Sequence, residues 1–331
     1  LPMAHRRIAA IMLVFLGASA IASLMVSCSP PEKQSLPEAA KKARVIVVSL
    51  QGYVGCGVDA EILRQPLAEA VADLNEPVDA VVFRFDSGGG MLNRVGLLSD
   101  MIHGYFNERE IECIGWIDRA ESAASIVALT IPDLWMPPEG VIGAAVGVRE
   151  TGPDIWETLP PQQQEAIRFM VAAAASRGGH DREVALSITL PDPSSSGTTH
   201  GARVLTGVKA SSVGLARNAD SLEDALNAIY GSDGWQIDLQ RSERIGRDVE
   251  KAEAARVQLT QLYQRLDGAI EAAGAGNAGA LEQADDLLGD LLALATVEDP
   301  AVQRAIEFLG GFQRVTRAID RLEALSDETE P

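Results

Sequence analysis

Two short segments contain residue types that could together hold a ligand and stabilise developing negative charge. Residues 85–90 read FDSGGG, and three consecutive glycines let the backbone turn tightly and bring peptide N–H groups close to a ligand. Residues 118–125 read DRAESAAS, and a serine there would begin an apolar helix, whose free N–H groups favour developing negative charge. Each segment also has a structural interpretation, because glycine-rich turns are common and a serine before a helix is an ordinary N-cap.

Predicted strands and helices alternate around these two segments. Short apolar strands are predicted at residues 45–48, 78–85 and 111–117, and the spacing of apolar residues predicts helices at 60–74, 92–106 and 123–130. Near-continuous apolar strands that alternate with helices are typical of an α/β fold whose sheet is covered on its faces. The sequence therefore predicts an α/β domain over residues 44–232, and each chemical segment directly follows one of its strands.

Residues 233–331 have a different pattern. Apolar residues recur at steps of three and four from Ile245 to Ile270 and again from Val302 to Leu322, which predicts long amphipathic helices. A glycine-rich stretch at 274–279 and a Glu-Asp-Pro sequence at 298–300 separate them. We expect a helical hairpin or small bundle with a structural role and no strand.

The composition excludes several classes of function. Acidic residues outnumber basic ones by 47 to 28 among 331 residues, for a formal net charge of −19. A nucleic-acid binder that relies on phosphate contacts needs a basic surplus, which this chain lacks. Its three cysteines are too few for a disulfide scaffold or paired zinc ligands, so we expect no metal site. Cys56 and Cys113 could pair, although an apolar strand around Cys113 favours a buried thiol.

The first residues resemble an export signal. Basic residues precede an uncharged, mostly apolar stretch at 8–26, as in a secretory signal peptide. Cys28 directly after this stretch resembles the lipidation site of bacterial lipoproteins. We therefore expect a lipoprotein-type signal peptide at 1–27, a tether at 28–43 and a bilayer anchor through Cys28, on the periplasmic side or the cell exterior. A plain transmembrane anchor is the alternative.

The order of the segments resembles the Clp protease/crotonase superfamily, and within it the NfeD-type and signal-peptide-peptidase-A-type membrane-associated serine peptidases. Those families have a Pro-Gly-Gly turn (here residues 87–90, with glycine replacing proline), a small-residue serine elbow (120–124) and an Ile-Gly-Ala-Ala segment (142–145). Gly143 follows Ser122 by 21 positions, as in these families. The resemblance continues through residues 204–216 and implies a spiral of ββα units.

The resemblance also implies which residues act. Ser122 would be the nucleophile that forms an acyl-enzyme, with Ser125 as a neighbour. The N–H groups of Gly89 or Gly90, together with that of Ala123, would form the oxyanion hole. No cofactor is implied.

The general base is missing from the positions where the resemblance places it. Clp proteases use a histidine about 25 residues after the serine, where Gly147 stands, and the NfeD-type lysine would fall near residues 161–164, which read PQQQ. A neutral amide cannot accept the serine proton. Lys209, His200 and His180 are the remaining candidates, so the sequence leaves the base unassigned.

Three functions remain open at this point. The first is a membrane-tethered serine endopeptidase that forms a homo-oligomer and cleaves peptides or membrane proteins. The second is a catalytically silent interaction module with the same fold. The third is a crotonase-like enzyme acting on acyl-CoA, which the absence of this cofactor outside the cytoplasm argues against.

Overall fold

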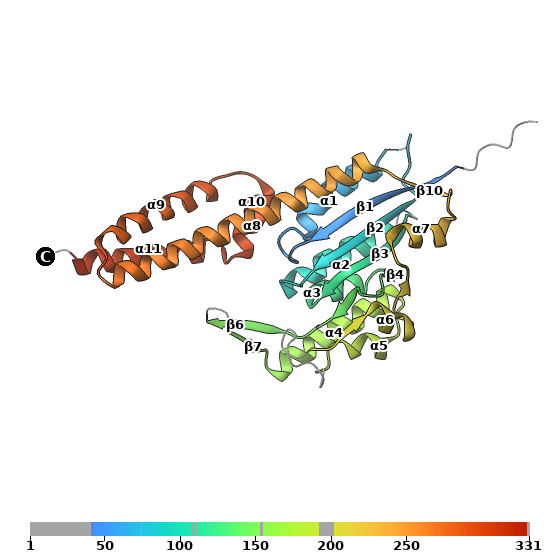
Figure 1. The fold of residues 1–331 in the computed structure, drawn as a ribbon, viewed down its shortest axis with the longest axis horizontal. Helices are drawn as coiled ribbons and strands as arrows, with labels where there is room; N and C mark the ends of the chain where they lie inside the picture. Colours follow the sequence, from blue (N-terminus) through green and yellow to red (C-terminus); the bar gives the residue numbers. More distant parts are fainter. Residues whose placement is uncertain are drawn as a thin grey trace, which may run out of the picture. The chain divides into compact units, whose positions relative to one another are not determined.

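A mostly parallel β-sheet forms the centre of the fold (Figure 1). The computed structural model describes residues 41–73, 75–107, 109, 111–152, 155–191 and 202–329. The sheet runs in the order β10-β1-β2-β3-β4-β9, with all neighbours parallel, while β5 pairs with the end of β3 and, antiparallel, with β8. These strands are β1 (Ala43–Gln51), β2 (Ala80–Ser87), β3 (Glu112–Glu121), β4 (Asp133–Met136), β5 (Val141–Gly143), β8 (Val204–Thr206), β9 (Arg217–Asn218) and β10 (Trp235–Ile237). A separate antiparallel pair contains β6 (Val148–Gly152) and β7 (Ile155–Thr158).

Helices connect the strands and continue beyond the sheet. Those of the α/β part are α1 (Ala60–Val71), α2 (Leu92–Asn107), α3 (Ala123–Ala128), α4 (Pro161–Gly178), α5 (Arg182–Ser187), α6 (Gly207–Ser212) and α7 (Leu222–Tyr230). The C-terminal helices are α8 (Leu239–Gly274), α9 (Ala278–Ala295), α10 (Pro300–Phe308) and α11 (Gly311–Thr329). The predicted α/β organisation followed by C-terminal helices is thereby confirmed.

Both faces of the central strands are buried. Along β2, Val81 and Phe83 point into a large core shared with α1, α2, α3 and α8, whereas Ala80 and Val82 point into a smaller core shared with α7. Because side chains alternate between the faces of a strand, a strand covered on both faces must be apolar throughout. The apolar runs in the sequence reflect this double coverage.

The structure corrects one prediction made from the sequence and decides a second question that the sequence left open. The prediction of no strand after residue 232 is wrong, because β10 lies there and pairs with β1. Three residues are too few for a recognisable alternating pattern, and the pairing with β1 determines the strand. Cys56 and Cys113 are both free thiols, so the possible disulfide is excluded. Burial raises the pKa of the Cys56 thiol to about 12, which makes it unreactive.

The long helix α8 joins the C-terminal helices to the α/β part. Its predicted apolar stripe is buried, and Ile245, Val249 and Ala252 belong to the same core as β1 and α1. Farther along, Leu259, Leu266 and other members of the stripe pack against α9 and α10. One helix therefore contributes to both parts.

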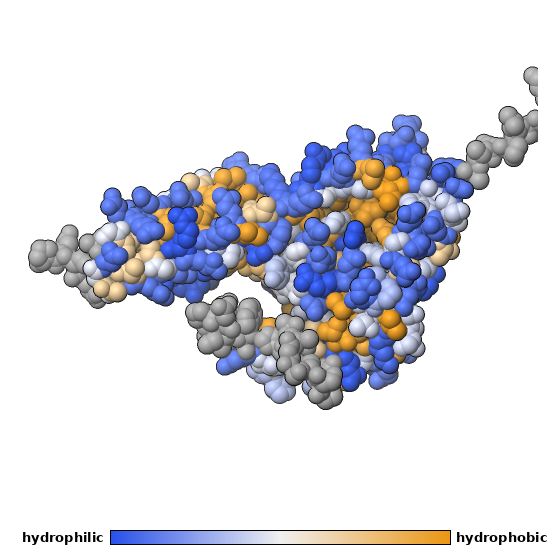
Figure 2. Space-filling model, in the orientation of Figure 1, coloured by the Kyte–Doolittle hydropathy of each residue, from blue (hydrophilic) through white to orange (hydrophobic). Residues whose placement is uncertain are grey.

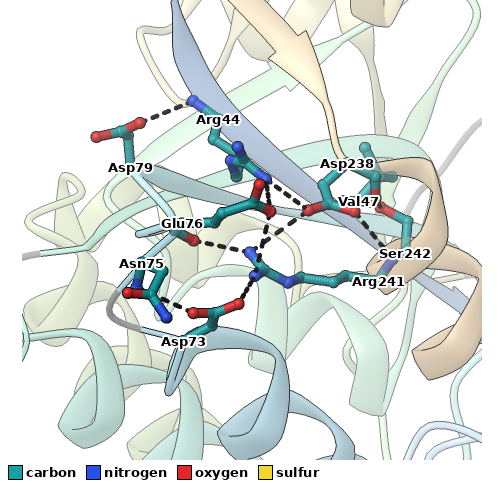
Figure 3. A network of polar contacts seen from close by, with 9 residues as sticks. All are labelled: Arg44, Val47, Asp73, Asn75, Glu76, Asp79, Asp238, Arg241 and Ser242. Atoms are coloured by element: carbon teal, nitrogen blue, oxygen red, sulfur yellow. Dashed lines mark hydrogen bonds and ion pairs between the residues drawn. The ribbon is translucent and has the colours of Figure 1, made fainter.

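A polar network fixes the start of α8 against the sheet (Figure 3). The buried Arg241 donates to the carbonyl oxygen of Glu76 and to the carboxylate of Asp73, each at 2.9 Å. Arg44 of β1 reaches the Glu76 carboxylate at 2.6 Å and that of Asp238 at 3.3 Å. The network therefore connects β1, the loop between α1 and β2, and the first turn of α8.

The surface gives no sign of a membrane-spanning helix in the described residues. On the face drawn in Figure 2, hydrophilic residues predominate and apolar ones gather in separate patches. None of the helices in the described ranges is both long and apolar enough to cross a bilayer. The expected signal peptide at 1–27, the lipidation site Cys28 and most of the tether lie outside the described residues.

Candidate active site

Ser122 occupies a strained turn between β3 and α3. Its backbone angles are φ 50° and ψ −123°, a conformation that L-residues rarely adopt and that costs about 1–3 kcal/mol. Ser122 stands at the N-cap position of α3, yet its hydroxyl makes no capping hydrogen bond. The hydroxyl of Ser125, by contrast, is buried and donates to the Ser122 carbonyl at 2.7 Å. Ser125 therefore has a structural role, and the N-cap interpretation does not account for Ser122.

The glycine turn packs directly against the Ser122 side chain. A Cβ added at Gly89 would lie 2.6 Å from the Ser122 Cβ and 3.2 Å from its Oγ. Gly89 has φ +107° and Gly90 φ +143°, so both occupy conformations that favour glycine. The structure thus brings together the two segments that the sequence singled out.

Two of the three predicted oxyanion donors are available. The Gly89 N–H donates to the Ser87 hydroxyl at 3.3 Å, while the Gly89 carbonyl accepts from the Val54 N–H at 2.8 Å. Because a trans peptide directs its C=O and N–H to opposite sides, the Gly90 N–H points away from Val54. Neither the Gly90 N–H nor that of Ala123 has a hydrogen-bond partner among the described residues, as expected for Ala123 in the first turn of a helix.

The predicted Ile-Gly-Ala-Ala segment supports the serine turn from the other side. The Ser122 N–H donates to the Gly143 carbonyl at 2.8 Å. Gly143 has φ +145°, and a Cβ there would lie 2.5 Å from the Arg203 carbonyl oxygen. Ala144 follows with φ 52° and donates to the same carbonyl at 2.8 Å. Ser122 and Ala144 are the non-glycine residues with positive φ in the described chain, and their proximity places the strain at the site.

Ser122 opens into a cavity of about 1090 Å³ between the α/β part and the C-terminal helices. One wall contains the glycine turn, Ser122, Ala144 and the start of β6; the other contains residues of α8, the α10–α11 turn and α11. The residues that line it are Tyr53, Gly88, Gly90, Met91, Glu121, Ser122, Ala144, Val146, Val148, Tyr263, Leu266, Asp267, Phe308, Leu309, Gly310, Arg314, Arg317, Ala318 and Arg321. Sequence reasoning missed the second wall, although arginines at 314, 317 and 321 share the helical spacing of one face.

The candidate bases do not gather at this cavity. Among its described lining residues there is no lysine or histidine. His180 lies beside the other end of α3, where its Nε2 is 2.8 Å from the Ile131 carbonyl oxygen, and burial lowers its pKa. Lys209 is exposed on α6. His200 lies outside the described residues, and the chain on either side of it is joined by an antiparallel bridge between Pro191 and Ala202.

The two positions where the resemblance would place a base contact each other. The side-chain amide of Gln164 donates to the Gly147 carbonyl at 2.7 Å and accepts from the Gly147 N–H at 3.1 Å. A Cβ at Gly147 would lie 2.3 Å from Ile167 Cδ1. This pair of hydrogen bonds uses both backbone groups of Gly147, so the two positions stabilise the loop and hold no proton acceptor for Ser122.

Comparison with known proteins finds similarity in structure. No family model and no curated protein sequence matches the chain. The chain is similar to a membrane-bound stomatin-specific protease. A serine-to-alanine variant of it has a TM-score of 0.47 and 17% identity, covering 58% of this chain and 86% of its own. A lysine-to-alanine variant with a substrate peptide has a TM-score of 0.47 and 17% identity, covering 57% and 81%. A membrane protease specific for a stomatin homolog from Pyrococcus horikoshii has a TM-score of 0.41 and 16% identity, covering 57% and 79%.

The chemistry available at the site follows from its own geometry. Ser122 supplies a hydroxyl, and Gly90 and Ala123 supply N–H groups that no described residue binds. Burial raises the pKa of Tyr263, so this cavity-lining phenol stays protonated at neutral pH. In the described part of the chain, no three His, Cys, Asp or Glu side chains come together as a metal site. The arrangement therefore fits attack on a carbonyl group with stabilisation of the resulting oxyanion.

Proposed function

We propose that this protein is a serine endopeptidase-like hydrolase with Ser122 as its nucleophile. The observation that carries the proposal is the strained Ser122 packed against Gly89, together with N–H groups of Gly90 and Ala123 that have no partner among the described residues. Backbone strain at a cavity-lining serine is typical of a nucleophile rather than of a helix cap.

The proposed reaction has two steps. The Ser122 Oγ bonds to the carbonyl carbon of a peptide and loses its proton to a base, while the Gly90 and Ala123 N–H groups hold the oxyanion. The C–N bond then breaks, and the amine leaves with the proton. Water next attacks the ester, which releases the carboxylate and restores the hydroxyl. Loss of one oxyanion donor costs about 2.7–4 kcal/mol of barrier in such sites.

His200 is the base that we propose for this reaction. Of the three candidate bases, His180 and Lys209 are not among the residues that line the cavity, which leaves His200 as the candidate to test. We expect His200→Gln to slow labelling of Ser122 by at least about a hundredfold, as is usual for loss of a general base.

The wider setting of the protein is also part of the proposal. The order of the sequence segments supports a spiral of ββα units related to the NfeD-type and signal-peptide-peptidase-A-type peptidases. The apolar N-terminal stretch and Cys28 support export and a lipid anchor, with peptides or membrane proteins as substrates. A homo-oligomer follows by analogy with those families.

A catalytically silent interaction module is the second candidate. The observation that favours it is the Gln164–Gly147 contact, together with a described cavity lining that lacks lysine and histidine. Such a module would bind peptides in the cavity without cleaving them.

A fluorophosphonate probe distinguishes the two candidates, because it forms a covalent bond only with an activated serine. We expect the full chain to be labelled at Ser122, the Ser122→Ala variant to lose labelling, and Ser212→Ala, which removes an exposed hydroxyl on α6, to retain it. An unlabelled wild-type chain of normal fold would contradict the hydrolase and support the silent module.

A further inference from the structure

Helix α11 presents a row of arginines to the cavity. Arg314, Arg317 and Arg321 line it, and their spacing of three and four residues places them on one face of the helix. Val315 and Leu322 are buried and hold the helix against its neighbours. The register of α11 is thereby set by its apolar residues, which aim the arginines at the cavity that contains Ser122.

This row has fewer acidic partners than arginines. Asp267 of α8 accepts a hydrogen bond from Arg314 at 3.2 Å and lies 3.5 Å from an Arg321 nitrogen. Arg314 also stacks on Tyr263, with 4.2 Å from its guanidinium carbon to the ring centre. The guanidinium of Arg317 donates to the Gln313 carbonyl within its own helix and has no carboxylate partner among the described residues.

The cavity therefore differs in charge from the rest of the chain. Its described lining contains three guanidinium groups against the carboxylates of Asp267 and Glu121, whereas the whole chain carries a formal charge of −19. Two of the three, Arg317 and Arg321, line the cavity and are exposed rather than buried. Guanidinium groups bind carboxylates through paired, charge-assisted hydrogen bonds, so the cavity is suited to an anionic ligand.

The other residues that line the cavity indicate the size and polarity of the rest of that ligand. Apolar side chains such as Met91, Leu266 and Leu309 lie in the same cavity as Ser122. A volume of about 1090 Å³ is slightly above the usual range for small-molecule sites, which leaves room for several residues of a peptide. The occupant that fits is a peptide with apolar side chains and at least one carboxylate.

We propose that Arg317 and Arg321 bind a carboxylate of the peptide held at Ser122, so that the protein selects acidic peptides or peptides with a free C-terminus. This inference rests on the proposed function, because it names the substrate class of the same site. Arg314 is held by both the Asp267 hydrogen bond and the Tyr263 ring, so it is the least available of the three arginines.

Binding of labelled peptides to the full-length Ser122→Ala variant tests the proposal without turnover. The probes are a fluorescent peptide of alanine and leucine with two glutamates and an amidated C-terminus, its glutamine counterpart, and the glutamine peptide with a free C-terminus. By fluorescence anisotropy, we expect a carboxylate-bearing peptide to bind at least about tenfold more tightly than the amidated glutamine peptide, as for a charge-assisted contact. The preferred probe identifies the source of the carboxylate.

Matched variants locate the effect. Adding Arg317→Gln and Arg321→Gln together should abolish the preference, whereas Arg247→Gln, at an exposed arginine of α8 outside the cavity lining, should retain it. Equal binding of all three peptides overturns the proposal. A second outcome also overturns it. If the two arginine substitutions weaken binding to vesicles of anionic lipid but leave peptide binding unchanged, the arginine row recognises a membrane instead.

The two proposals fail separately. A Ser122 that reacts with the fluorophosphonate probe in a protein without carboxylate preference overturns only the specificity inference. A carboxylate preference in a protein that the probe does not label contradicts the hydrolase and leaves the arginine site in place.

Discussion

Gly89 determines how closely a substrate carbonyl can approach Ser122. We expect Gly89→Ala to lower the rate of fluorophosphonate labelling at least about tenfold, because the new Cβ would lie 2.6 Å from the Ser122 Cβ and displace the serine from its position beside the donors. Overpacking of this kind and the positive φ of +107° should also lower the free energy of unfolding by about 1–3 kcal/mol. Labelling rates and urea denaturation measure the two effects.

Gly96 provides the matched control for this substitution. It is exposed on α2, and a Cβ there would meet no atom within 4 Å. Gly96→Ala should leave labelling unchanged and raise the free energy of unfolding by up to about 1 kcal/mol through helix propensity. Equal labelling of the two variants would mean that Gly89 does not shape the site.

The sequence predicted which segments form this site better than it predicted their conformations. The glycine turn and Ser122 follow β2 and β3, which are adjacent and parallel, so strand order alone brings them to one edge of the sheet. The positive φ of Ser122 and Ala144 and the contact of Gln164 with Gly147 depend on tertiary contacts. No local pattern encodes these features, which is why the position of a base remained open.

Asp299 links two of the C-terminal helices through its charge. It caps α10 by accepting from the Ala301 and Val302 N–H groups, and it pairs with Lys251 of α8. The Lys251 hydrogen bond, helped by the two N–H groups, lowers the pKa of Asp299. A carboxyl group whose pKa is lower in the folded state stabilises the fold above its unfolded pKa, about 3.9, and loses this contribution as the pH falls through the folded value.

The charge of Asp299 can be tested separately from its cap. Asp299→Asn keeps an N-capping side chain, so we expect its deficit in unfolding free energy to be constant above about pH 5 and to shrink below about pH 4. The free energy of unfolding of Asp299→Ala should be lower than that of Asp299→Asn by about 1 kcal/mol at every pH, because alanine cannot cap the helix. Urea denaturation across this pH range measures both, with Asp290→Asn, at an exposed position of α9, as the control.

Helices with a long periodic pattern of apolar residues could be predicted from the sequence. The predicted helix at 92–106 corresponds to α2, and the stripe from Ile245 to Ile270 corresponds to the buried face of α8. The strand β10 was missed because its three residues depend on pairing with β1. Burial of one face leaves a periodic record in the sequence, whereas a short edge pairing leaves none.

At the scale of the whole molecule, the C-terminal helices have a role that composition alone did not indicate. Their apolar stripes predicted a structural bundle, and the structure uses α8, α10 and α11 also as one wall of the cavity at Ser122. Which faces of two distant segments meet depends on contacts between residues that are far apart in sequence. The arginine row was therefore readable as a helical face, but its position opposite Ser122 was not.

An aromatic contact across the cavity tests whether the two parts stabilise each other. Tyr53 follows β1 and Phe308 ends α10, with ring centres 5.5 Å apart and planes inclined by 41°. In a double-mutant cycle with Tyr53→Ala and Phe308→Ala, we expect a coupling of about 0.5–1.5 kcal/mol in the free energy of unfolding, as for other aromatic pairs. The same cycle with Tyr53→Ala and Phe169→Ala, at an exposed ring of α4, should be additive. Additivity in both cycles would mean that this ring contact does not couple the two walls, and that the core shared through α8 joins them instead.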